Sequence, residues 1–202
     1  MGFPLLRPRI RCSILAGGFG LFIQLYLEET FDTVTRLKTF LNESTLQPIH
    51  GSIPQWHGFL AQVKSILGNF NNRISFVALL MAKAYLVRKL ALAPFDATSK
   101  AQGAPGLDIE ERTLKGERVI GEIKTTEPYL MHDFGAQQLS MFKKDFDKLN
   151  AESAAYKFFF VSDSRSFELM KRKYAKRIPG VTFVSLLTNE ECIATASSAA
   201  SM

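Results

Sequence analysis

The chain has 202 residues, 47% of them hydrophobic, with 25 lysines and arginines against 19 aspartates and glutamates, a formal net charge of +6. Such a chain can bury the core of one soluble domain, and its modest basic excess is compatible with a polyanionic partner. Its two cysteines, Cys12 and Cys192, lie near opposite ends, which argues against a zinc site and favours a reducing compartment, the cytoplasm.

The first 27 residues combine a basic stretch, 7–11, with an apolar run, 14–27. The apolar run is too short for a membrane span, so we expect no membrane association. We interpret residues 1–27 as a targeting segment or as sequence outside the working domain, with a first buried helix as the alternative. No small-residue cleavage site follows the run, which leaves these alternatives open.

Helical spacing of apolar residues predicts helices over 27–43 and 56–67, which complete an N-terminal helical segment, 1–72. A third helix, 74–92, is apolar on nearly all sides and is expected to be buried against a sheet, with Asn72 as its N-cap. The small, polar stretch that follows, 96–105, is typical of a surface loop.

The period then changes to that of strands. An antiparallel pair is expected at 107–110 and 118–123. It is followed by elements predicted as helix 134–149, strand 156–161, helix 166–176 and strand 181–187. This order predicts an α/β core over 73–190, with a mixed central sheet flanked by helices, and a flexible tail over 191–202.

Polar residues at the predicted strand pair form the candidate site. Asp108 belongs to the first strand, and Glu122-Ile123-Lys124 ends the second. Because side chains alternate along a strand, Glu122 and Lys124 should share a face, with Ile123 opposite. Two carboxylates suit Mg²⁺, and an ammonium group suits a developing anion, so the pattern indicates phosphodiester hydrolysis.

This arrangement resembles the PD-(D/E)XK nuclease superfamily, which includes many restriction endonucleases. Asp108 would match the PD element, although Pro105 is not adjacent to it, and Glu122-Ile123-Lys124 would match the (D/E)XK element. The predicted helix carrying Gln137 and Gln138 resembles the glutamine-bearing helix that follows this element in several branches. The resemblance covers about 74–187 and implies a restriction-endonuclease-like core.

The resemblance also implies roles for these residues. Asp108, Glu122 and the Ile123 carbonyl would bind one or two Mg²⁺ ions, with Mn²⁺ as a substitute, and Lys124 would orient the attacking water or stabilise charge. Gln138 or Gln137 would hold the nucleophile side or a DNA phosphate in place.

One departure concerns the helix before the PD element, which in many members carries an additional acidic ligand. The stretch 74–92 contains no Asp or Glu. Glu110 or Asp96 would have to compensate, although neither occupies the matching position, so the number of metal ions stays open.

Basic residues on the later helices form the candidate DNA-binding set. These residues are Lys143, Lys144, Lys148, Lys171 and Arg172. They could contact phosphates beside the cleft and give affinity without sequence preference. The alternative is that they are solvated residues on helix surfaces.

These observations predict a Mg²⁺-dependent endonuclease that hydrolyses DNA phosphodiester bonds. Cleavage of both strands by one small site would require two copies, so we expect a homodimer. The main alternative is a catalytically inactive DNA-binding or assembly module with the same fold. A further alternative treats Asp108, Glu122 and Lys124 as a surface ion network of an interaction protein.

Overall fold

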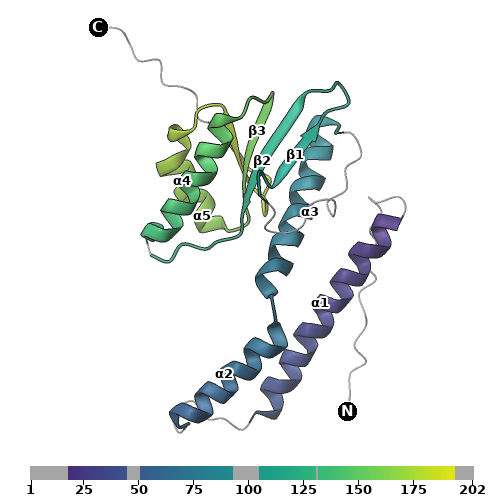
Figure 1. Ribbon diagram of the computed structural model, residues 1–202, viewed down its shortest axis with the longest axis vertical. Helices are drawn as coiled ribbons and strands as arrows, with labels where there is room; N and C mark the ends of the chain where they lie inside the picture. The colour runs from purple at the N-terminus through teal and green to yellow at the C-terminus, as the bar shows by residue number, and fades with distance from the viewer. Residues whose placement is uncertain (1–17, 45–50, 93–104, 131, 194–202) are drawn as a thin grey trace. The chain divides into compact units, whose positions relative to one another are not determined.

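The structure is a computed structural model that describes residues 18–44, 51–92, 105–130 and 132–193 (Figure 1). The chain forms two compact units, 1–70 and 71–202. No helix in these described ranges is long and apolar enough to cross a membrane. The predicted 96–105 loop falls almost entirely outside the described residues, as do most of the N-terminal basic and apolar stretch and the end of the predicted tail.

The first unit contains helices α1 (Gly18–Glu43) and α2 (Ile53–Leu67), which confirms the two predicted helices and extends each toward its N-terminus. The Phe59 ring of α2 packs against Phe40 of α1, with ring centroids 5.3 Å apart. At the start of α2, the Ser52 amide donates to the Gln55 side chain at 2.8 Å, a contact that satisfies a helix-terminal donor.

Helix α3 (Phe70–Leu90) begins earlier than predicted, so Asn72 lies inside the helix and the prediction that it is the N-cap is wrong. The expected burial is confirmed for the part of α3 nearest its C-terminus. Ala82 and Leu86 are fully buried there, in a cluster with residues of the central sheet.

The sheet has five strands in sequential order: β1 (Ile109–Arg112), β2 (Arg118–Lys124), β3 (Tyr156–Val161), β4 (Val181–Ser185) and β5 (Glu191–Ile193). Pairing is antiparallel between β1 and β2, parallel from β2 to β4, and antiparallel between β4 and β5. The predicted mixed α/β architecture is therefore confirmed. The strand β5 corrects the boundary of the predicted tail, because 191–193 pair with β4.

Helices cover both faces of this sheet (Figure 1). One face packs against α3, and the other packs against α4 (Ala136–Ala151) and α5 (Ser164–Leu169). The predicted helix 166–176 is instead α5 followed by a π-helical turn, Met170–Tyr174, and a short 3₁₀ turn. The α4 side has the larger core, which includes an aromatic group of Phe142, Phe146, Phe159 and Phe183.

Candidate functional site

The antiparallel register of β1 and β2 places Asp108 beside Glu122. Ile109 pairs with Gly121, so the next step along the two chains sets Asp108 opposite Glu122. The Ile123 amide donates to Asp108 Oδ2 at 2.8 Å, which fixes the aspartate at this point. The structure thus brings the two predicted acids together at the carboxyl end of β2, the end at which open α/β sheets bind ligands.

The alternation expected along β2 is present. Ile120, which shares the face of Glu122 and Lys124, belongs to the core on the α4 side. Ile123 packs with the core on the α3 side. Glu122 is only 1% exposed, so its carboxyl group lies in the interior between β2 and α4.

Helix α4 brings two further charged residues to this position. The Lys124 ammonium lies 2.7 Å from Asp145 Oδ2. The Lys148 ammonium lies 3.2 Å from Glu122 Oε1 and 3.4 Å from Asp145 Oδ1. We refer to Asp108, Glu122, Lys124, Asp145 and Lys148 as the site cluster.

Asp145 is buried, and sequence reasoning did not single it out. Its Oδ2 atom is inaccessible to solvent and receives no hydrogen bond from the described residues. The short distance to Lys124 brings the two charges together, but the contact lacks the angles of a hydrogen bond. Ion-pair attraction depends on distance, so the two charges stabilise each other, and Oδ2 can still accept a hydrogen bond.

Burial raises the pKa of Glu122 from its ordinary 4.5 to about 8, with the charges of Asp108 and Asp145 acting in the same direction. A hydrogen bond with Asp108 adds to this effect, and the Lys148 contact opposes it. For Lys148, burial lowers the pKa, but the neighbouring carboxylates outweigh burial and leave the pKa raised. Strongly perturbed carboxyl groups of this kind gather at functional sites.

This shift predicts a pH-dependent effect on stability. Because the folded chain binds the Glu122 proton more tightly than the unfolded chain, Glu122 lowers the free energy of unfolding as pH rises from 4.5 toward 8. Glu122→Gln cannot ionise, so its stability relative to wild type should increase across that window. Urea unfolding at about pH 4 and about pH 9, on either side of the window, measures the difference. An equal difference at both pH values would contradict the assignment.

Gln138 has a structural role at the start of α4. Its Oε1 accepts hydrogen bonds from the amides of Tyr129, at 3.1 Å, and Gly135, at 2.9 Å. Its Nε2 donates to the carbonyl of Glu127 at 2.6 Å. These three contacts hold Glu127, Tyr129 and Gly135 to the start of the helix, so the structure does not bring Gln138 into the site cluster. Gln137 is exposed.

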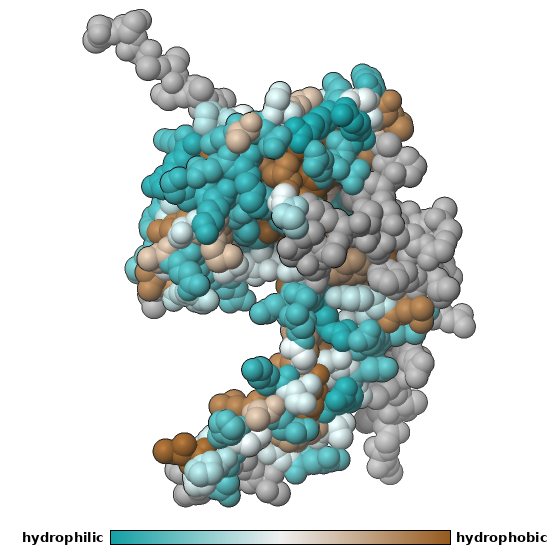
Figure 2. Space-filling model, viewed as in Figure 1, coloured by the Kyte–Doolittle hydropathy of each residue, from teal (hydrophilic) through white to brown (hydrophobic). Residues whose placement is uncertain are grey.

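The other predicted DNA-binding residues lie apart from the site cluster. Lys143 forms an exposed ion pair with Asp147 at 2.6 Å, and Lys171 pairs with Glu190. Lys144 and Arg172 are exposed. The surface over α4 is mainly hydrophilic in Figure 2, which suits either solvent or a polyanion. Phosphate binding by these residues stays a prediction.

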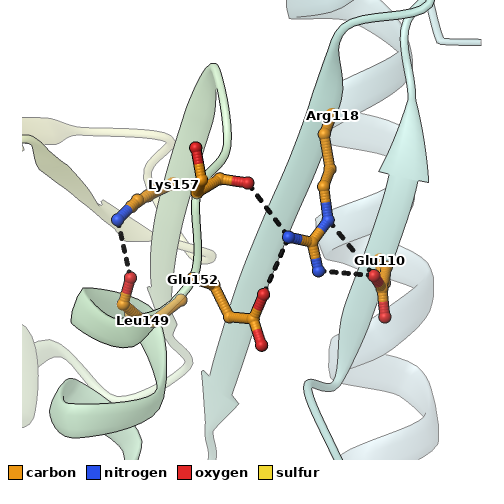
Figure 3. A network of polar contacts seen from close by, with 6 residues as sticks. Glu110, Arg118, Leu149, Glu152 and Lys157 are labelled. Carbon is orange, nitrogen blue, oxygen red and sulfur yellow. Dashed lines mark hydrogen bonds and ion pairs between the residues drawn. The ribbon is translucent and has the colours of Figure 1, made fainter.

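A polar network fixes the C-terminal end of α4 to the sheet (Figure 3). Arg118 of β2 bonds Glu152, just beyond α4, at 2.8 Å and Glu110 of β1 at 2.6 Å. Lys157 of β3 donates to the Leu149 carbonyl at 2.8 Å and so satisfies an acceptor in the last helical turn. Together with the Gln138 contacts, this network sets the distance between α4 and β2.

The donor chemistry of the site cluster suits Mg²⁺, which prefers carboxylate and carbonyl oxygens. The buried Asp145 Oδ2 atom, which accepts no hydrogen bond from the described residues, is an additional oxygen available to a metal ion. Within the described ranges, however, no three acidic, histidine or cysteine side chains already surround one ion position. Glu110 is paired with Arg118 and does not supply the missing acid, and Asp96 lies outside the described residues.

Comparisons of the chain with protein-family models, curated proteins and solved structures found no match.

Proposed function

We propose that the chain is a metal-dependent nuclease of the PD-(D/E)XK type, which hydrolyses DNA phosphodiester bonds with Mg²⁺. One observation carries the proposal: Glu122, 1% exposed, lies at the carboxyl end of β2 beside two other acids and two lysines. Burying two carboxyl groups, those of Glu122 and Asp145, is unfavourable for folding, and perturbed groups of this kind gather where they perform chemistry.

Four members of the site cluster would have a task in this chemistry. Asp108 and Glu122 would hold the ion, with the Ile123 carbonyl as a further ligand, and the bound ion would polarise the phosphate and activate water. Asp108 is exposed and can reach a substrate from solvent. Lys124, which lies 2.7 Å from Asp145 Oδ2, would balance the negative charge that develops on the phosphate oxygens.

A second candidate function is a DNA-binding or assembly module without activity. It is favoured by the ion pairs, because Lys124 and Lys148 already balance Asp145 and Glu122 without a metal ion. The surface ion network considered from the sequence does not fit, because Glu122 and Asp145 are buried.

Incubation with supercoiled plasmid DNA and Mg²⁺ separates the two candidates. We expect wild type to nick the plasmid and Asp108→Asn to lose most of this activity, because the variant removes one charged ligand without changing side-chain size. Glu110→Gln, two residues along the same segment, should retain activity. Circular dichroism checks that each variant folds.

Equal nicking by wild type and Asp108→Asn would indicate a contaminating nuclease and reject the proposal. Salt-dependent retention of DNA without cleavage would support the inactive binding module, because phosphate contacts weaken as salt rises. Absence of both cleavage and retention would reject DNA as the partner.

A further inference from the structure

The Lys148 ammonium is surrounded by oxygen atoms from three separate segments. It lies 3.2 Å from Glu122 Oε1 on β2 and 3.4 Å from Asp145 Oδ1 on α4. The third oxygen is the carbonyl of Gly106, at 3.3 Å, in the segment leading to Asp108. Gly106 has φ of 103°, a conformation that glycine adopts readily and other residues rarely do. Two buried carboxylates and a main-chain carbonyl therefore converge on one cation.

These contacts are longer than those of a well-formed ammonium–carboxylate pair, which measures about 2.7–2.9 Å. Lys148 is shared among three acceptors and is not matched closely to any one of them. In contrast, Lys124 has a single close contact with Asp145, at 2.7 Å, and its side chain is 16% exposed. The Lys148 side chain is 44% exposed, so its flexible stem already lies along the surface and can carry the ammonium into solvent.

Departure of Lys148 would remove the only described positive charge that contacts the Glu122 carboxylate. The Glu122 and Asp145 side chains are 2% and 8% exposed, so water cannot replace the lost cation well. The lost positive charge must then be compensated at the same position, by a proton or by another cation. Oxygen donors of this kind select a hard divalent ion such as Mg²⁺ or Mn²⁺.

We propose that Lys148 occupies the divalent-ion position of the site in the free protein, and that ion binding displaces its ammonium into solvent. The proposal rests on the nuclease function above and deepens it. Lys148 is then the cation bound at the site in the free protein, and not a residue that contacts DNA. The proposal also adds Asp145 and the Gly106 carbonyl to the ion's ligands. In the described residues, no three acidic side chains surround one ion position. The proposal accounts for this, because the Lys148 ammonium lies between the carboxylates of Glu122 and Asp145.

Two measurements on the full-length chain test the exchange. Electron paramagnetic resonance of free Mn²⁺ reports binding, and acetylation by an amine-reactive ester, read by mass spectrometry, reports exposure of each lysine. As Mn²⁺ saturates the site, acetylation of Lys148 should rise several-fold. The Mn²⁺ concentration at the midpoint of this rise should equal the concentration at the midpoint of Mn²⁺ binding. Lys143, on the same helix and in an exposed pair with Asp147, is the internal control and should not change.

Mn²⁺ binding with unchanged or reduced labelling of Lys148 would overturn the exchange and leave the nuclease proposal standing. Absence of Mn²⁺ binding would overturn both. Lys148→Met provides a second test, since removal of a competing cation should leave Mn²⁺ binding at least as tight as in wild type. A loss of affinity of about 10–100-fold, the effect expected for a residue that supports a metal site, would also overturn the exchange.

Discussion

Glu122→Gln should abolish Mg²⁺-dependent cleavage while leaving the protein folded. The substitution keeps the shape of the side chain but removes the negative charge that would hold the ion. We expect the nicking rate to fall by about 100-fold or more, since loss of residues that merely support metal ligands costs about 10–100-fold. The rate is measured with plasmid DNA at saturating Mg²⁺.

The stability of this variant separates a catalytic from a structural role. If Glu122 served the fold alone, its loss would lower the free energy of unfolding. Because its pKa is raised to about 8, the variant should be at least as stable as wild type in alkaline solution. A less active and more stable variant is the pattern of a residue kept for function. Wild-type activity in Glu122→Gln would refute the catalytic assignment.

Phe159→Ala should be among the most destabilising single substitutions in the second unit. Phe159 of β3 is fully buried, and its ring centroid lies 5.0 Å from that of Phe146 and 5.4 Å from that of Phe183. Truncation of a buried phenylalanine costs about 3–5 kcal/mol, a large share of the stability of a typical domain, about 5–15 kcal/mol. Chemical denaturation measures this difference.

The matched control is Tyr129→Ala, because Tyr129 is an aromatic residue that is 76% exposed. Its truncation should change the free energy of unfolding by no more than about 0.5 kcal/mol. Comparable losses for the two variants would show that the aromatic core is not where the unit derives its stability.

The elements that could be predicted from the sequence are those with a regular apolar period. The change from helical spacing in 74–92 to alternation in 118–123 indicates α3 and β2, and both are present. The strand β5 has three residues, Glu-Cys-Ile, too few to show alternation, and it forms because β4 offers an open edge. Hydrogen bonding to β4 decided this element, and the local sequence pattern could not indicate it.

The candidate site was predictable in part for the same reason. Asp108 and Glu122 are found from strand alternation and register. Asp145 required a different signal: it lies within the apolar stripe of α4, three residues after Phe142 and next to Phe146, so it faces the sheet. A charged residue on the buried side of a helix marks a site. Gln138 could not be assigned from sequence, because its partners belong to a loop without a regular pattern.

The parallel pairing of β2 with β3 has a consequence for the order of synthesis. Every residue of the site cluster lies between 108 and 148, whereas Phe159, the β3 residue paired with Glu122, is made later. Until 156–161 pair with β2, the strand that carries Glu122 lacks one of its two neighbours in the sheet. Burial is the main cause of the raised pKa of Glu122, so we expect this pKa to depend on the completed sheet.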